Sequence, residues 1–167
     1  MTLKLISDAI ANDQIVQGAL SDLESGLKVR LAVTKSAIPY VSATVAKTRP
    51  VVLIAATERA AQDLANSLRD FVPEENIAVF PAWETLPHER LSPSSDTVGR
   101  RMAVLRRLAH PKEVSPIKVL VTSARAFIQP IVAGLGDVPA LKISTGDDFS
   151  LEKLVTELSR LGFDRVD

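Results

Sequence analysis

The chain has 167 residues, and its 20 Lys and Arg balance its 20 Asp and Glu, so the surplus of cations that binds nucleic acid is missing. It has no cysteine and two histidines, which excludes disulfides, thiolate metal sites and a cysteine nucleophile, and the histidines form no zinc motif. Its apolar runs are too short to span a membrane and it opens without a secretion signal, so we expect a cytoplasmic protein.

The first 25 residues carry apolar side chains at helical spacing. This spacing predicts a helical hairpin that packs on the sheet formed by the following residues. The apolar residues are Leu3, Ile6, Ile10, Ile15, Val16, Leu20 and Leu23.

Three short apolar runs rich in β-branched residues come next, at Val29–Val33, Val51–Ala56 and Lys118–Thr122. Runs without polar alternation are typical of strands that are buried on both faces, as in a parallel sheet. Helical segments separate these runs, so the sequence predicts an open α/β fold with a mostly parallel sheet.

The segment that follows Val51–Ala56 is expected to form a helix. Thr57 is a good N-cap, because its hydroxyl can accept a hydrogen bond from the first turn. The apolar face of this helix would be formed by Ala60, Ala61, Leu64 and Leu68.

A second helix is expected to begin near Ser95 or Asp96 and to end before Pro111. Its apolar stripe would be formed by Val98, Met102, Leu105 and Ala109. Four arginines lie outside this stripe, which indicates a solvated face with weak or no DNA binding. They are Arg100, Arg101, Arg106 and Arg107.

The pattern changes after residue 128, so we expect one domain at 1–128 and a second at 129–167. Ala140–Ser144 is predicted to be a strand, and Ser150 can cap a helix that carries Leu151, Leu154 and Leu158. A strand and a helix alone bury little surface, so this α+β unit is expected to be the truncated beginning of a domain.

A long irregular connection covers residues 80–93 and reads Phe-Pro-Ala-Trp-Glu-Thr-Leu-Pro-His-Glu-Arg-Leu-Ser-Pro. Its prolines oppose a helix, and loops of this length are usually functional or disordered. Trp83, the only tryptophan, would pin the loop to the sheet by burying its ring. His88 and Glu89 lack an evident nucleophile or orienting partner, so we predict no catalytic residue.

This connection resembles the signature of the transcription-repair coupling factors (Mfd). The matching residues are Phe80, Pro81, Trp83, Glu84, Thr85, Leu86 and Pro87, followed by Ser92-Pro93 and Arg100-Arg101. Val51–Leu68 is similar to helicase motif Ia of the related repair protein UvrB. The resemblance covers about residues 31–167. It implies a fold like UvrB domain 1a for residues 1–128 and the beginning of the UvrA-binding second domain for residues 129–167.

Two departures from UvrB affect the expected function. The tyrosine-rich hairpin that UvrB carries after its Ser-Ser-Asp-Thr run has no counterpart after Thr97, so lesion inspection is not expected. Where UvrB has a Walker A loop, Thr-Gly-Ser-Gly-Lys-Thr, this chain has a degenerate P-loop with neither the glycines nor the lysine that hold phosphate. It comprises Thr34, Lys35, Ser36, Ala37, Ile38 and Pro39.

The resemblance therefore implies a non-catalytic module without ATP, magnesium or another metal. It would contribute to recruitment of UvrA in transcription-coupled nucleotide excision repair and, in the intact protein, to autoinhibition of an ATP-dependent DNA translocase. RNA polymerase, DNA and ATP would bind other parts of that helicase-family hydrolase. Phe163 and Arg165 match a Tyr-x-Arg stretch at the UvrA contact of UvrB and are the predicted partner-binding residues. A truncated UvrB-type repair domain and a small nucleotide-binding α/β protein are the alternatives.

Overall fold

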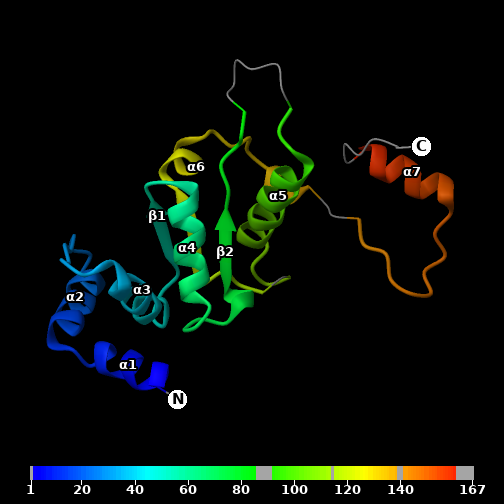
Figure 1. Cartoon of the computed structure of the whole chain (residues 1–167). Helices are drawn as coiled ribbons and strands as arrows, with labels where there is room; N and C mark the ends of the chain where they lie inside the picture. The colour runs from blue at the N-terminus through cyan, green and yellow to red at the C-terminus, as the bar shows by residue number, and fades with distance from the viewer. Residues whose placement is uncertain (1, 86–91, 114, 139–140, 161–167) are drawn as a thin grey trace. The chain divides into compact units, whose positions relative to one another are not determined.

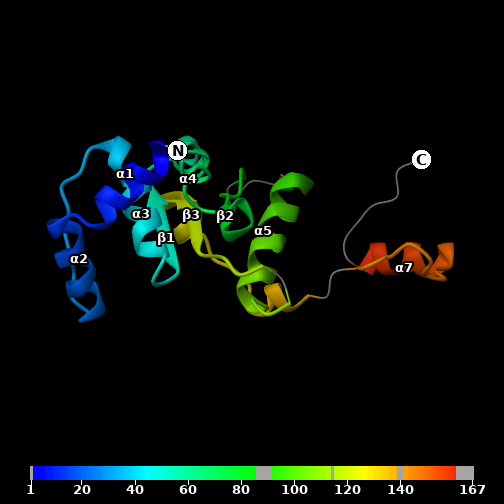
Figure 2. The same ribbon diagram turned by 90° about the horizontal axis from the view of Figure 1, so that it is seen from below.

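The computed structural model describes residues 2–85, 92–113, 115–138 and 141–160. They form two compact units, Met1–Asp137 and Val138–Asp167. The first unit contains a parallel sheet with helices on both faces, and the second contains one helix (Figures 1 and 2).

The N-terminal helical hairpin is present, as predicted. Helix α1 (Thr2–Ala11) and helix α2 (Gln14–Glu24) are separated by Asp13, whose carboxylate accepts from the backbone N of Ile15 at 2.9 Å. Helix α1 packs against helix α3 (Ile38–Ala46), which in turn contacts β1 and α4. The hairpin therefore joins the sheet through α3.

The sheet has three parallel strands in the order β1-β3-β2. Strands β1 (Val51–Ala55) and β3 (Val119–Ser123) confirm two of the predicted strands. Helix α4 (Glu58–Leu68) connects β1 to β2, and helix α5 (Ser95–Ala109) lies between β2 and β3 in the chain. The predicted α/β fold with a parallel sheet is thus confirmed.

The sequence prediction of the strands also contains errors. Strand β2 (Ile77–Phe80) was not predicted, because four residues that include an alanine give little pattern. Val29–Val33 forms no strand, and residues 141–144 of the second unit form none either. An apolar run becomes a strand only when another backbone pairs with it, and neither segment has a pairing partner among the described residues.

Alternate side chains of the strands build two separate cores. On the α4 face of the sheet, small and branched apolar residues of α3 and α4 cover β3. The buried members are Ala43, Ala46, Ala61, Ala65, Leu68, Val72, Ile77, Val119 and Val121. On the α5 face, helix α5 and the short helix α6 (Ala124–Ile128) pack on a second cluster, formed by Ala78, Phe80, Ala82, Val104 and Ala126.

Helices α4 and α5 lie where they were predicted, but the N-cap of α5 is Ser94 rather than Ser95 or Asp96. Thr57 accepts from the backbone N of Ala60 at 3.1 Å, and Ser94 accepts from that of Thr97 at 3.3 Å. The predicted stripe of α5 is only partly right: Leu105 packs against the core, but Val98 is exposed, and the buried side chains are Thr97, Arg101 and Val104. Polar contacts with the 80–93 connection determine which face of α5 is buried.

The first unit extends beyond residue 128. A short 3-10 turn, η3 (Leu135–Asp137), packs on α5. A Cβ on Gly136 would lie 2.7 Å from the carbonyl oxygen of Leu105 and 3.0 Å from the Cβ of Ala109, so only glycine fits this contact.

The second unit contains helix α7 (Leu151–Arg160). The hydroxyl of Ser150 accepts from the backbone N of Lys153 at 3.2 Å, which confirms the predicted cap. None of the helices in the described ranges is long and apolar enough to cross a membrane.

Candidate functional site

Several residues of the predicted signature gather around one buried cation, Arg101. Its side chain extends from α5 and is 1% exposed. The guanidinium carbon lies 4.1 Å from the ring centre of Phe80, at the end of β2, and 4.2 Å from that of Trp83. Both distances are within the range of cation–π attraction, which is stronger where water is excluded.

Arg101 also makes hydrogen bonds to the backbone that follows β2. Its Nη1 donates to the carbonyl oxygen of Pro81 at 2.7 Å and lies 3.5 Å from Oε1 of Gln129. Burial lowers the pKa of the Arg101 guanidinium below its usual value, and the carboxylate of Glu58 opposes this shift.

Gln129 holds the backbone of Trp83. Its Oε1 accepts from the Trp83 backbone N at 2.7 Å, and its Nε2 donates to the Trp83 carbonyl oxygen at 3.4 Å. This side chain, 46 residues farther along the chain, thus satisfies both backbone groups of a residue outside the sheet.

Glu84 ties the two ends of the connection together. Its carboxylate accepts from the hydroxyl of Ser94 at 2.6 Å and from the hydroxyl of Thr97. These hydroxyls, with Ser94 making the largest contribution, lower the pKa of Glu84 to about 2. The guanidinium of Arg125 donates to the Glu84 carbonyl oxygen at 3.2 Å. Residues 84 and 94 therefore lie side by side, joined by a hydrogen bond between their side chains.

The structure brings together four of the seven predicted signature residues, Phe80, Pro81, Trp83 and Glu84. Thr85 follows them and is half-buried. Leu86 and Pro87 lie outside the described residues, as do His88 and Glu89. The predicted partner-binding residues Phe163 and Arg165 also lie outside them.

Arg101 was predicted to lie on a solvated helix face, and this prediction is wrong. Helical periodicity assigns an arginine to solvent unless a specific partner is known, and the partners here are two aromatic rings outside the helix. The signature did pair Arg101 with Phe80 and Trp83 in sequence. Their occurrence in the same motif was the one sequence signal that these three residues are in contact. No sequence signal indicated the contacts of Gln129, Ser94 and Thr97.

The other arginines of α5 make local polar contacts. Arg100 forms an exposed ion pair with Asp96 at 3.0 Å, and Arg106 pairs with Glu113 at 3.1 Å. Arg107 donates to the carbonyl oxygens of Ser115 and Ile77, at 3.1 and 3.4 Å. Each of these guanidinium groups thus has a partner within the chain.

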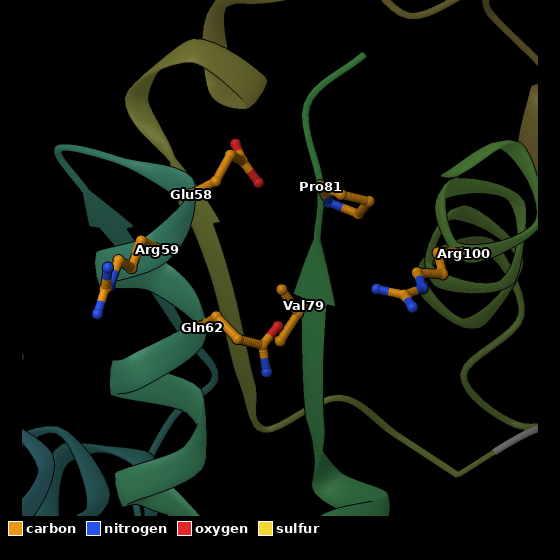
Figure 3. A pocket seen from close by; sticks show the side chains of 6 residues that line it. All are labelled: Glu58, Arg59, Gln62, Val79, Pro81 and Arg100. Carbon is orange, nitrogen blue, oxygen red and sulfur yellow. The ribbon is translucent and has the colours of Figure 1, made fainter. Parts of the chain in front are cut away.

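An open pocket of about 330 Å³ lies beside the Arg101 cluster, between α4 and α5. It is lined by Glu58, Arg59, Gln62, Val79, Pro81 and Arg100 (Figure 3). Glu58 extends from the beginning of α4 toward Pro81, whereas Arg59 points away from β2 (Figure 3). The lining contains one acidic side chain, Glu58, and two basic ones, Arg59 and Arg100. None of the lining residues is a nucleophile placed beside a base.

The pocket has no obvious metal site either. Within the described ranges, no group of three or more His, Asp or Glu side chains could hold a metal ion.

Residues Thr34–Pro39, which were predicted to be a degenerate P-loop, form a tight turn into a helix. Lys35–Ala37 is a 3-10 turn, and the hydroxyls of Thr34 and Ser36 lie 3.1 Å apart and hydrogen-bond to each other. Helix α3 begins at Ile38, and Pro39 is buried in its first turn.

Known proteins similar to this chain are repair factors. Over 143 residues, 84% of the chain, it is 42% identical to the transcription-repair-coupling factor of Mycobacterium tuberculosis. It is 28% identical to that of Myxococcus xanthus over 121 residues, 68% of the chain and 10% of that protein. UvrABC system protein B of Thermosipho africanus is 22% identical over 165 residues, 91% of the chain and 25% of that protein. No family model matches the chain.

The chain spans 12% of the length of the mycobacterial relatives that it matches. The alignments with the coupling factors and with UvrB overlap, and both the signature at 80–87 and the parallel α/β sheet fit this relationship. The chain belongs to the N-terminal UvrB-homology region of the transcription-repair-coupling factors.

Proposed function

We propose that this chain is a non-catalytic docking module that contributes to the recruitment of UvrA in transcription-coupled repair. The observation that carries the proposal is the geometry of Thr34–Pro39, the counterpart of the UvrB nucleotide loop. A module of this family without a working nucleotide loop would act through its surface rather than through hydrolysis.

Three features of this segment oppose phosphate binding. A phosphate at a helix N-terminus needs free backbone N–H groups, and Pro39, in the first turn of α3, has none. Ile38 offers no cation, and Lys35 lies in the turn that precedes the helix. The hydroxyls of Thr34 and Ser36, which could otherwise contact magnesium, are paired with each other.

Equilibrium unfolding with and without Mg-ATP tests this step. A ligand present at a hundred times its dissociation constant would raise the free energy of unfolding by about 2.7 kcal/mol. We expect no change at millimolar Mg-ATP, with a UvrB protein as the positive control. A saturable stabilisation of this chain would overturn the assignment of a non-nucleotide module.

Recruitment of UvrA is proposed to involve the second unit, through Phe163 and Arg165. An arginine fork can bind a carboxylate of a partner in a bidentate way. The test replaces the matching 143-residue stretch of the M. tuberculosis coupling factor with this chain and measures UvrA binding by interferometry. The chimera should bind, and Arg165→Ala and Phe163→Ala should each weaken binding at least tenfold.

The matched control for that experiment is Arg59→Ala, which removes an exposed charge from α4 of the first unit. It should leave UvrA binding unchanged. Equal losses for Arg59→Ala and Arg165→Ala would show a non-specific charge effect, and a chimera that does not bind would refute the docking role.

In the intact protein, the same module is proposed to hold the DNA translocase in an inactive state. This role predicts that deletion of the module from the chimera raises the ATPase rate, whereas the chimera itself keeps a low basal rate. Equal rates for the two proteins would refute autoinhibition and leave UvrA docking untouched.

Weak or no DNA binding is part of the proposal, because the α5 arginines have partners within the chain. Non-specific DNA binding at physiological salt typically has a dissociation constant of about 10⁻⁴ to 10⁻⁶ M. Fluorescence anisotropy with a duplex at low salt should show no saturation in the micromolar range. Micromolar affinity that falls steeply with salt would contradict this expectation.

A further inference from the structure

The segment that follows α6 is attached to the rest of the first unit near both of its ends. Residues 129–137 form this exit segment, which continues into Val138, the first residue of the second unit. Gln129, Leu135 and Gly136 are half-buried, whereas residues 130–134 between them are exposed. The exit segment is therefore held at its beginning and at its end, and these two places are its first and second anchor.

The first anchor is the side chain of Gln129. Its Oε1 accepts from the backbone N of Trp83 at 2.7 Å, and Nη1 of Arg101 lies 3.5 Å from the same oxygen. Its Nε2 donates to the carbonyl oxygen of Trp83 at 3.4 Å. On α6, just before the exit segment, Arg125 donates to the carbonyl oxygen of Glu84 at 3.2 Å. The beginning of the exit segment is thus bonded to the connection that follows β2.

The second anchor is the turn η3, which packs on the C-terminal half of α5. Gly136 lies so close to α5 that an added Cβ would be 2.7 Å from the carbonyl oxygen of Leu105 and 3.0 Å from the Cβ of Ala109. Oδ1 of Asp137 lies 3.0 Å from Nε2 of His110, the C-cap residue of α5. The exit segment is thus in contact with α5 immediately before the second unit begins.

Both the connection and η3 lie against the same row of side chains on α5. The row consists of four residues that are spaced four apart, Thr97, Arg101, Leu105 and Ala109. Its first half contacts the connection, since Thr97 donates to Glu84 and Arg101 donates to the carbonyl oxygen of Pro81. Its second half contacts η3. One helix, rising about 12 Å between Arg101 and Ala109, therefore carries both sets of contacts.

We propose that α5 couples the connection to the exit segment, so that the contacts at the two anchors form and break together. Each anchor consists of few contacts, and each holds the exit segment within reach of the other. The short tether at residues 130–134 keeps the effective concentration of the second contact high once the first is made. Loss of one anchor therefore weakens the other, although the two anchors have no side chain in common.

The coupling gives the connection an influence on the second unit. A partner that displaces Trp83 from Gln129 would weaken the contact of η3 with α5, and would so release the point at which the second unit begins. This use of the coupling rests on the proposed docking of UvrA through the second unit, whereas the coupling itself does not.

Hydrogen exchange of single amides in the 167-residue chain, measured by NMR, tests the coupling. Gln129→Ala removes the first anchor and leaves the residues of η3 unchanged. The Asp137 amide donates to the carbonyl oxygen of Gly134 at 2.9 Å. It should exchange roughly fivefold faster or more in this variant, because η3 opens more often. The matched control is Gln62→Ala, at an exposed glutamine of α4, which should not change the exchange of this amide.

The reverse change should have the corresponding effect, because coupling between two sites is reciprocal. Asp137→Ala weakens the second anchor and leaves Gln129 and Trp83 unchanged. The Trp83 amide, which donates to Gln129, should then exchange roughly threefold faster or more. The matched control is Asp63→Ala, at an exposed aspartate of α4, which should not change the exchange of the Trp83 amide.

The Val72 amide, which donates to the carbonyl oxygen of Leu68 in the core on the α4 face, reports any loss of global stability. Faster exchange at Asp137 in Gln129→Ala, beyond the change at Val72, supports the coupling. An Asp137 amide that does not respond, or that speeds up only as much as Val72, would overturn it. A Trp83 amide that is unaffected by Asp137→Ala would overturn it as well. UvrA takes no part in these measurements, so failure of the coupling is distinguishable from failure of the docking role.

Discussion

The two faces of the sheet are held by cores of different chemistry. On the α4 face, Ala61, Ala65 and Leu68 are almost completely buried against the valines of β3, and the whole cluster is apolar. On the α5 face, the largest fully buried side chain is Arg101, which lies between two aromatic rings. Phe80 and Trp83, two residues of the predicted signature, lie at this second core.

This difference explains why the signature combines aromatic, acidic and basic residues. An apolar core needs only side chains of suitable volume, so many combinations can fill it. A buried cation needs an acceptor and a polarisable surround, because each buried charge without a partner is costly. Pro81, Trp83 and Gln129 meet part of those needs, whereas the buried Nε of Arg101 has no hydrogen-bond partner among the described residues. Changes on this face should therefore affect the connection as well as the stability.

The largest expected effect lies on the apolar face. Leu68→Ala leaves a cavity below the centre of the sheet and should lower the free energy of unfolding by about 3–5 kcal/mol. Urea unfolding followed by circular dichroism measures the loss. Leu108→Ala, at a half-exposed leucine of α5, is the control and should cost less than about 1 kcal/mol. Equal losses would mean that the α4 face is not a packed core.

Arg101→Ala should lower the free energy of unfolding by about 3 kcal/mol, since it removes two cation–π contacts and a charged hydrogen bond. It should also shift the emission of Trp83 to longer wavelength in the folded state, which Leu68→Ala should not do.

Arg101→Met separates charge from volume in the same core. A flexible apolar side chain should refill the space and recover about half of the lost stability, because buried ions can often be replaced by hydrophobic groups. The Trp83 emission should remain shifted. A methionine variant with the stability and spectrum of the unchanged chain would show that packing alone holds the connection.

Two glycines near α5 should respond in opposite directions to the same added methyl group. Gly136→Ala should destabilise by about 2 kcal/mol, because its Cβ overlaps the backbone of Leu105. Gly99→Ala, within α5 and with nothing near its Cβ, should stabilise by up to about 1 kcal/mol. Thermal unfolding of both variants measures the pair. Stabilisation by both would mean that η3 does not pack tightly on α5.

The smallest effect concerns Glu84, whose carboxylate is exposed at the base of the connection. Its pKa of about 2 in the folded chain lies below the ordinary value of 4.5. The hydrogen bonds from Ser94 and Thr97 therefore contribute stability that is fully present above pH 4.5 and is lost as the pH falls toward 2.

Glu84→Gln should remove the contribution of this carboxylate to the pH dependence of the free energy of unfolding. The difference in that free energy between the variant and the unchanged chain should therefore shrink as the pH falls from 4.5 to 2. Glu24→Gln, at an exposed glutamate at the end of α2, serves as the control. A constant difference for Glu84→Gln would mean that the hydroxyl contacts do not depend on the charge.

Local signals made much of the α/β framework predictable from the sequence. Thr57 marks the beginning of α4, and Pro111 limits α5. β3 is an apolar run at the centre of the sheet. β1 is an apolar run at the edge of the sheet, where Val52 and Ile54 are half-exposed instead of buried on both faces as predicted. Pairing is not a local property, so Val29–Val33 looks like a strand and is none, while the short β2 forms because β3 provides its partner.

The candidate site could be predicted only in outline. The sequence identified the connection that begins at Phe80, because its motif is unusual and contains the single tryptophan, but Trp83 is half-buried rather than fully buried. It assigned Arg101 to solvent, because periodicity does not describe contacts between α5 and the end of β2. Gln129 lies in a segment that carried no signal.

The pairing of Gln129 with Trp83 has a consequence for backbone protection. A side-chain amide, like a peptide group, has a carbonyl acceptor and N–H donors. The Gln129 amide accepts from the N–H of Trp83 and donates to its carbonyl oxygen, as the backbone of a neighbouring strand would do. The Trp83 amide should therefore exchange its hydrogen for deuterium nearly as slowly as the β2 amides. In Gln129→Ala, that amide should exchange at the rate of an ordinary loop.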